Sequence, residues 1–314
     1  MRIPRWASVV FSGVILAVMF AVLPQYIDIK QVSTALRPLS LVIVAAATVV
    51  MWLNFAVTTI RLRVVMRHLY DRPPGFISLF QLNLLSLFIT HLSPVGAAAD
   101  VARIGYARVR MNIPIRIAVE SIVFDRILGL FGIVLLAILL MPIQWAIGVS
   151  AKIWIPQVVL WIFCVLALTG LHIMARHQII QRWRVIAEMG RSVQKFFSLF
   201  TLPGDYVIQG LLALGYSGTF SFLMWLLARA MGFTPDLVIF FAFGPLMLLA
   251  QNMPIFYVGW GAREAIALLT LGGSGVLEPA QALAVSVATG VIFLIASLPG
   301  SVVWLWHPRV MRAG

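Results

Sequence analysis

Long apolar runs separated by short polar stretches form the dominant pattern along this chain. A helix that crosses a bilayer needs roughly 20 predominantly apolar residues. Six runs come close to that length or exceed it, and the stretches between them are short. We therefore expect about six membrane-spanning helices, at 7–23, 39–60, 118–141, 153–174, 206–227 and 281–305.

Two further apolar segments, 76–102 and 237–271, are interrupted by proline and glycine. If residues 76–92 formed an ordinary span, the basic strips 93–117 and 175–205 would both lie outside the cell. Such an arrangement contradicts the rule that Lys and Arg concentrate in cytoplasmic loops. The charges therefore favour hairpins that enter the membrane and leave on the same side.

In the re-entrant arrangement, the first segment enters from the cytoplasm and turns back near Pro94 and Gly96. The second enters from outside and turns back near Gly259 and Gly261. Seventeen basic residues then lie on the cytoplasmic side, Arg61 among them, and four lie outside. This asymmetry places both chain termini in the cytoplasm. Ordinary kinked spans remain the alternative for both segments.

The re-entrant arrangement also makes the second half of the chain an inverted copy of the first. A span, a broken segment and a span occur at about 39–141, and again in the opposite orientation at about 206–305. An amphipathic cytoplasmic linker at about 175–205 joins the two. We predict one all-α polytopic membrane domain over 1–314 with an inverted repeat, a pattern typical of transporters that bind substrate near the midplane.

Composition supports the membrane assignment and narrows the chemistry. The chain is 62% hydrophobic and 11% charged, and its mean hydropathy is +1.02, whereas about a quarter of a soluble domain is charged. The net charge of +13 fits a cytoplasmic face against anionic lipid and does not require nucleic acid. A single cysteine, Cys164, and five histidines without metal-ligand spacing predict no disulfide, metal or cofactor. No nucleotide-binding or hydrolase motif is present, so we do not expect an enzyme.

Charged residues inside the apolar segments are the candidate functional residues, because intramembrane ions are rare and usually face a cavity or each other. The neighbours Asp125–Arg126 and Arg263–Glu264 point about 100° apart on a helix. Neither couple is therefore expected to pair internally. We expect Arg126 to reach Glu264 and Arg263 to reach Asp125 across the repeats; a purely structural quartet is the alternative.

A polar substrate would meet this quartet and the broken backbone beside it. Arginine can bind a phosphate through two bonds, and amides after Gly259 and Gly261 would favour an anion. Asn83 and His91 are further polar candidates, with interhelical bonding as the alternative role. Asp100 and Arg103 can instead pair with each other on one helical face. The predicted substrate-binding residues are Asp100, Arg103, Asp125, Arg126, Gln251, Asn252, Gly259, Gly261, Arg263 and Glu264.

At these residues the chain resembles the lysylphosphatidylglycerol synthase transmembrane family, also called flippase-like. One family signature falls on Pro94, Gly96, Asp100, Arg103, Ala118, Ser121, Asp125, Arg126, Gly129 and Leu130. A second falls on Pro254, Gly259, Gly261, Arg263 and Glu264, and the last helix carries Leu298-Pro299-Gly300. In bifunctional members of the family this domain moves an aminoacylated lipid between leaflets, and a separate soluble domain synthesises it. The resemblance implies lipid transport without aminoacyl transfer.

Three functions remain open from the sequence. The leading hypothesis is a flippase of the bacterial inner membrane for an anionic, aminoacylated, glycosylated or hopanoid lipid. The second is a membrane subunit that presents lipid to a separate synthase or glycosyltransferase, docked at the basic linker. The third is a secondary transporter of a small soluble anion. A homo-oligomer is compatible with each.

Overall fold

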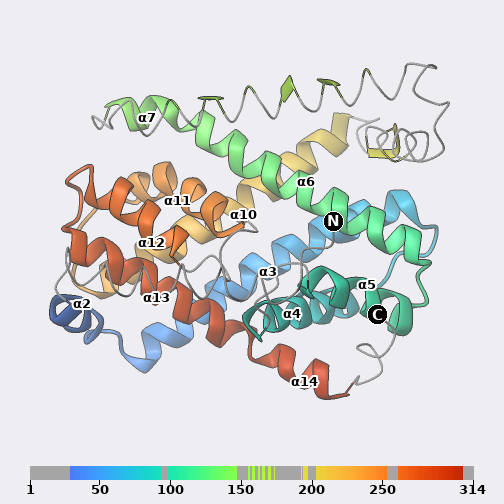
Figure 1. Ribbon diagram of the computed structural model, residues 1–314, viewed down its shortest axis with the longest axis horizontal. Coiled ribbons are helices and arrows are strands. Elements are labelled where there is room, and N and C mark those ends of the chain that lie inside the picture. The colour runs from blue at the N-terminus through green and yellow to red at the C-terminus, as the bar shows by residue number, and fades with distance from the viewer. Residues whose placement is uncertain are drawn as a thin grey trace, which may run out of the picture.

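The computed structural model describes residues 29–92, 98–146, 203–252 and 261–306, together with isolated residues between 155 and 196 (Figure 1). Within these residues every regular element is a helix, which confirms the all-α prediction. The elements are α2 (Ile29–Leu36), α3 (Leu41–Leu69), α4 (Phe76–Leu92), α5 (Ala98–Met111), α6 (Ile115–Leu139), α7 (Met141–Ala146), α10 (Pro203–Ala230), α11 (Leu237–Asn252), α12 (Ala262–Ala267), the π-helix η3 (Leu268–Gly272), α13 (Pro279–Ser297) and α14 (Pro299–Trp306).

Four of the described stretches are long and apolar enough to cross a membrane: α3, α6, residues 207–230 of α10, and α13 with α14. They correspond to the predicted spans 39–60, 118–141, 206–227 and 281–305. Proline marks several helix starts, where its missing N–H costs nothing: Pro114 precedes α6, and Pro203, Pro279 and Pro299 begin α10, α13 and α14. The predicted spans 7–23 and 153–174 fall mostly outside the described residues.

The two broken segments form pairs of short helices. Helix α4 packs along α5, and α11 packs against α12. With 17 and 16 residues, α4 and α11 are about 25 Å long, less than the roughly 30 Å of a hydrocarbon core. The first turn, near Pro94 and Gly96, lies outside the described residues. The order of long helix, broken pair and long helix occurs twice, while the repeat boundaries stay a prediction.

Helix α3 extends well beyond the predicted end of its span. No proline or glycine interrupts residues 41–69, and the helix continues to Leu69, where Tyr70 caps it in an extended conformation. The expectation that the span ends at residue 60, with Arg61 in the strip that follows it, is therefore wrong. Arg61 is buried, with 5% of its surface exposed. A continuous helix carries this side chain into the protein interior.

Three apolar clusters pack the described helices together. The largest lies among α10, α11 and α13 and includes Phe220, Phe243 and Phe293. A second surrounds the α4–α5 pair and the end of α3, and a small third one lies between α3 and α6 around Phe124. The glycine of the Leu-Pro-Gly motif lies against α4, because a Cβ at Gly300 would meet the carbonyl oxygen of Leu84. Glycine thus lets α14 approach the backbone of α4 (Figure 1).

Candidate functional site

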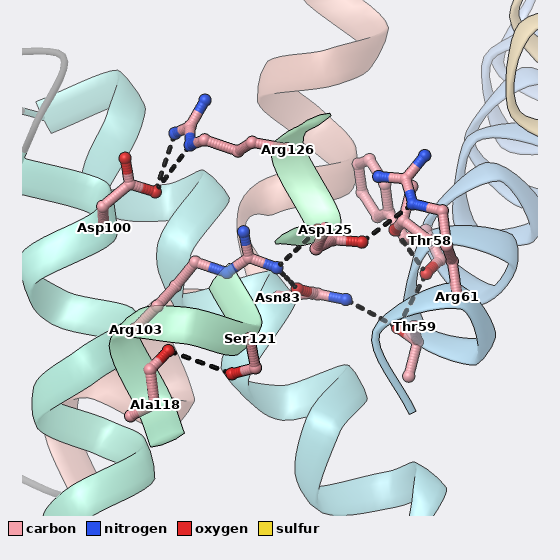
Figure 2. Close-up of polar contacts among 11 residues, drawn as sticks. Thr58, Thr59, Arg61, Asn83, Asp100, Arg103, Ala118, Ser121, Asp125 and Arg126 are labelled. Atoms are coloured by element: carbon pink, nitrogen blue, oxygen red, sulfur yellow. Dashed lines mark hydrogen bonds and ion pairs between the residues drawn. The ribbon is translucent and has the colours of Figure 1, made fainter. Parts of the chain in front are cut away.

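A buried ion pair joins the two long helices of the first half of the chain. Arg61 of α3 donates from Nε to Oδ1 of Asp125 on α6 at 2.8 Å (Figure 2). The guanidinium of Arg61 also lies over the ring of Tyr216 on α10, 5.4 Å from its centroid. Cation–π contact of this kind helps to hold a desolvated arginine. Arg61 is therefore fixed between three helices.

Asp125 also accepts a hydrogen bond from a second arginine. Nη2 of Arg103 on α5 lies 3.4 Å from Oδ2 of Asp125 and donates to Oδ1 of Asn83 on α4 at 2.6 Å. Asn83 in turn donates to Thr59 on α3 at 2.8 Å. We call these residues the polar ring, because the contacts pass from α3 through α6, α5 and α4 back to α3 (Figure 2). Its members are Thr59, Arg61, Asn83, Arg103 and Asp125.

The ionised side chains of the polar ring are buried and lie well within the long helices. Arg61, Arg103 and Asp125 are 5%, 8% and 3% exposed. Asp125 is preceded by ten residues of α6, which places it about 15 Å along the helix at 1.5 Å per residue. Ionised groups at such depth are costly and usually functional. The ring is thus the strongest candidate site among the described residues.

A glycine on α6 provides the space that Arg61 occupies. Gly129 lies one helical turn after Asp125, on the same face. A Cβ at this position would stand 2.9 Å from Nη2 and 3.0 Å from Nη1 of Arg61. Any side chain there would push against the guanidinium. In the motif Asp-Arg-x-x-Gly, the aspartate is therefore the counterion of Arg61, and the glycine on the same helix face leaves space for its guanidinium.

A second ion pair lies beside the ring and is more accessible. Arg126 donates from Nε and Nη2 to Oδ1 of Asp100 at 3.0 and 2.7 Å. Its side chain is 48% exposed, and that of Asp100 is 26% exposed. Asp100 occupies the first turn of α5. The two neighbours Asp125 and Arg126 thus diverge as expected, one into the ring and the other towards α5.

Two nitrogen atoms of the ring have no hydrogen-bond partner. They are Nη1 of Arg61 and Nε of Arg103, and both are buried. Buried polar atoms of this kind are rare in folded proteins, because each loses its hydration without compensation. The site therefore holds donors for which the described residues supply no acceptor.

The second half of the chain carries a second buried ion pair. Arg263 donates from Nη2 to Oε1 of Glu264 at 2.7 Å and from Nε to Ser286 on α13 at 3.1 Å. Ser286 donates to the same Oε1 at 3.0 Å. Arg263 and Glu264 are each 2% exposed. Arg263 and Glu264 thus form a buried ion pair whose charges cancel, and Ser286 links the pair to α13.

The expected exchange of partners across the repeats is therefore wrong. Asp125 binds Arg61 and Arg103, Arg126 binds Asp100, and Arg263 binds its own neighbour. Asp100 and Arg103, which could have paired on one face, have separate partners as well.

The reason for the internal pair at 263–264 is the start of α12. Gly261 caps this helix with φ of 88°, a conformation suited to glycine. Glu264 reaches back to accept from the Gly261 amide at 2.6 Å, so its carboxylate meets the Arg263 guanidinium. Of the amides between Gly259 and the start of α12, which were expected to attract a substrate anion, that of Gly261 is occupied by this carboxylate.

A family model described as Lysylphosphatidylglycerol synthase TM region matches residues 5–300. The chain belongs to the lysylphosphatidylglycerol synthase transmembrane family. No curated protein and no solved structure gives a significant match. The family assignment makes this a membrane protein of lipid metabolism or transport, and it confirms the resemblance seen in the motifs.

The signatures that the chain shares with the lysylphosphatidylglycerol synthase transmembrane family now have a physical explanation. In the first, Asp100, Arg103, Asp125 and Arg126 make the two neighbouring ion-pair groups, and Gly129 leaves space for Arg61. In the second, Gly261, Arg263 and Glu264 form the capped helix start. The Leu-Pro-Gly motif positions α14 against α4.

The remaining candidate residues are not part of the polar ring. Asn252 is exposed and donates to Leu248 of its own helix at 2.7 Å. Gln251 is half-buried, with an unpartnered Oε1. Gly259 lies outside the described residues. His91 bonds to Leu87 at 2.9 Å and lies within electrostatic range of Arg263, so the two broken segments approach each other there.

Sequence reasoning missed Arg61 and Thr59 as site residues. A signal for Arg61 was present, since residues 41–69 contain no helix breaker and the next proline is Pro73. The helix was therefore free to continue past the apolar run. Thr59 carried no signal, because a threonine in an apolar helix usually bonds its own backbone, as Thr59 also does with Phe55.

A polar clasp near the start of α6 holds part of the linker. Glu120 accepts from Lys195 at 3.0 Å, from Ser192 at 3.1 Å and from Arg116 at 3.2 Å. Phe196 packs edge-on against Phe124 with ring centroids 5.3 Å apart. The described end of the predicted linker 175–205 is thus docked on α6, while most of the linker lies outside the described residues.

Proposed function

We propose that the protein is a lipid flippase of the bacterial inner membrane, which moves a polar-headed lipid between leaflets. The observation that carries this proposal is the polar ring, in which three buried ionised side chains, with Asn83 and Thr59, join four helices about 15 Å along α6. Apolar packing usually stabilises helices at least as well as a buried ion pair. Ionised groups kept at that depth are better explained by a polar group that must cross.

The pair of Arg126 and Asp100 is the access point to the ring. Arg126 is half-exposed on α6, whereas Arg61 and Arg103 behind it are buried. In the flippase cycle the lipid head meets Arg126 first and then the ring, while the acyl chains stay in the bilayer. In this order Arg126 binds the lipid head on entry, and Arg103 binds it within the ring. Arg263, fully paired with Glu264 and Ser286, holds the second half of the fold.

The orientation in this proposal places the basic segments in the cytoplasm. It rests on the distribution of Lys and Arg along the sequence and on the preference of these residues for the cytoplasmic side. The clasp of Glu120 with Lys195 then lies on the cytoplasmic side of the ring.

Leaflet exchange of head-labelled lipids by purified protein in liposomes tests the proposal. The lipids are a glycerophospholipid, an aminoacylated lipid and a glycosylated lipid, each compared with protein-free liposomes. We expect exchange of at least one lipid by the wild type and at least tenfold slower exchange by Arg126→Gln. The control is Arg116→Gln, because Arg116 is on the same helix and is 54% exposed.

Absence of exchange with all three lipids from folded wild-type protein would contradict the flippase proposal. Equal rates of exchange by Arg126→Gln and wild type would be compatible with lipid transport but would contradict the role of Arg126 as the entry site.

A further inference from the structure

The polar ring and the pair beside it form one electrostatic unit with an excess of positive charge. Arg61, Arg103 and Arg126 are cationic, and Asp100 and Asp125 are anionic. The charges of all four other residues act on Arg103, so the five lie within electrostatic range of one another. With every group ionised the unit carries one net positive charge. In a low-dielectric interior an unbalanced charge is strongly unfavourable and attracts an anion.

The hydrogen bonds of the unit show the same excess. Nη1 of Arg61 and Nε of Arg103 are buried and unpartnered. The contact of Arg103 with Asp125 is long, at 3.4 Å, compared with 2.8 Å for Arg61 with Asp125. Of the two arginines that contact Asp125, Arg103 therefore has the weaker contact with its counterion. A new acceptor placed beside Arg103 would form a stronger hydrogen bond than the long contact with Asp125 that it replaces.

We propose that Arg61, Arg103 and Arg126 bind a phosphodiester, and that Asp100 and Asp125 act as internal counterions that occupy these arginines while the site is empty. The proposal rests on the proposed function and names the substrate class of the same site. The phosphate displaces Asp100 from Arg126 first, because that pair is exposed, and then accepts from Arg103 in place of its long contact with Asp125. No covalent bond changes in this exchange.

A phosphodiester suits the site for two reasons. Its single negative charge neutralises the single excess positive charge, whereas a phosphomonoester adds more negative charge than the unit lacks. Its unesterified oxygens accept from guanidinium forks, which match phosphate geometry. An uncharged sugar or hopanoid head would leave the positive charge unbalanced. The two aspartates also explain how the site releases its ligand, since they compete with it for the same arginines.

Binding in detergent tests this exchange separately from transport. The probes are short-chain phosphatidylglycerol, short-chain phosphatidic acid, a short-chain diacylglycerol glucoside and inorganic phosphate, titrated against the full chain with bound lipid detected by native mass spectrometry. We expect phosphatidylglycerol to bind at least tenfold more tightly than the glucoside and more tightly than phosphatidic acid. Inorganic phosphate should compete weakly, which distinguishes a lipid head from a free anion.

Variants then test the counterion role. Arg103→Gln should weaken phosphatidylglycerol binding at least tenfold, and Arg103→Lys should restore only part of it because the fork is lost. Asp100→Asn removes the competing counterion and should tighten binding several-fold. Such a gain cannot come from misfolding. The control is Arg229→Gln, since Arg229 is exposed in the last turn of α10.

Several results would overturn the proposal: equal binding of the glucoside, tighter binding of phosphatidic acid or inorganic phosphate than of phosphatidylglycerol, or unchanged affinity in Asp100→Asn. Its failure is distinct from failure of the flippase proposal. Exchange of neutral lipids that is insensitive to Arg103→Gln would remove the phosphodiester site and keep the flippase. Binding as expected, but without leaflet exchange of any lipid, would support the phosphodiester site and contradict the flippase proposal.

Discussion

Arg61 and Asp125 are separated by 64 residues in the sequence, and Nε of the arginine donates to Oδ1 of the aspartate across 2.8 Å. The pair joins α3 to α6 in the interior, and Asp125 also accepts from Arg103 on α5. One carboxylate thus neutralises part of the charge of two arginines. The stability of the first half of the fold and its candidate chemistry depend on the same residue.

Replacing Asp125 should therefore be costly, and the cost should depend on Arg61. Asp125→Ala leaves two buried guanidinium groups without this counterion, and we expect a loss of about 3–5 kcal/mol in unfolding free energy. The double variant Arg61→Met/Asp125→Ala should lose less than the sum of the single changes, with a coupling of about 0.5–3 kcal/mol. Equilibrium unfolding in mixed micelles measures each term. Combining Asp125→Ala with Arg229→Met should give no coupling; additive costs for Arg61 and Asp125 would contradict the ion pair.

Gly129→Ala tests the fit of Arg61 against α6. The added Cβ would lie 2.9 Å from Nη2 of Arg61, so we expect the guanidinium to shift and lipid exchange to fall at least tenfold. Helix propensity by itself would favour alanine by about 1 kcal/mol. The control is Gly210→Ala on α10, where a Cβ would meet nothing within 4 Å. Exchange by Gly129→Ala at the wild-type rate would show that the position of Arg61 does not matter for transport.

Glu264→Gln should act on stability rather than on the choice of lipid. Arg263 is 2% exposed and loses its ionised partner in this variant, so we expect a loss of about 3–5 kcal/mol. The comparison is Asp100→Asn, whose partner Arg126 is half-exposed and whose loss should cost about 1 kcal/mol or less. Thermal unfolding of both variants in the same detergent gives the difference. Similar melting temperatures would contradict a structural role for the second cluster.

Glu120→Gln should release the docked end of the linker. The change removes the charge that Lys195 and Ser192 share on α6. We expect backbone hydrogen exchange around residues 192–196 to become about tenfold faster, corresponding to about 1.4 kcal/mol. Hydrogen-exchange mass spectrometry measures this peptide directly. Arg116→Gln is the matched control, because Arg116 binds Glu120 from the same helix and does not contact the linker through that bond. Unchanged exchange in Glu120→Gln would mean that contacts other than those of the Glu120 carboxylate hold the segment.

The prediction of the repeat architecture used features that are local in sequence. The length of apolar runs, the breakers at 94–96 and 259–261, and the distribution of arginines favour two broken segments between long helices. In the described residues α4–α5 and α11–α12 occupy those places. The expectation that Asp125 and Arg126 separate to different partners also followed from helical geometry alone.

The partners themselves could not be read from the sequence. Arg61 followed the apolar run and resembled the other arginines near it, Arg63, Arg67 and Arg72. Its burial depends on the continuation of α3 beneath α6 and on the absence of a side chain at Gly129. Arg263 and Glu264 looked unable to pair because adjacent helical residues diverge. The first turn of a short helix is an exception, since a capping glutamate bends back towards Gly261.

The sequence by itself determined that the chain is a helical membrane protein, where its apolar segments break, and, apart from Arg61, which ionisable groups of the candidate site lie within them. These properties follow from the cost of placing polar groups in hydrocarbon, which acts on each segment separately. Only the tertiary structure decided which charges neutralise one another and which donors remain unpaired. Ion pairs form over a few ångströms between helices far apart in sequence, so their pattern depends on the packing of α3, α4, α5 and α6.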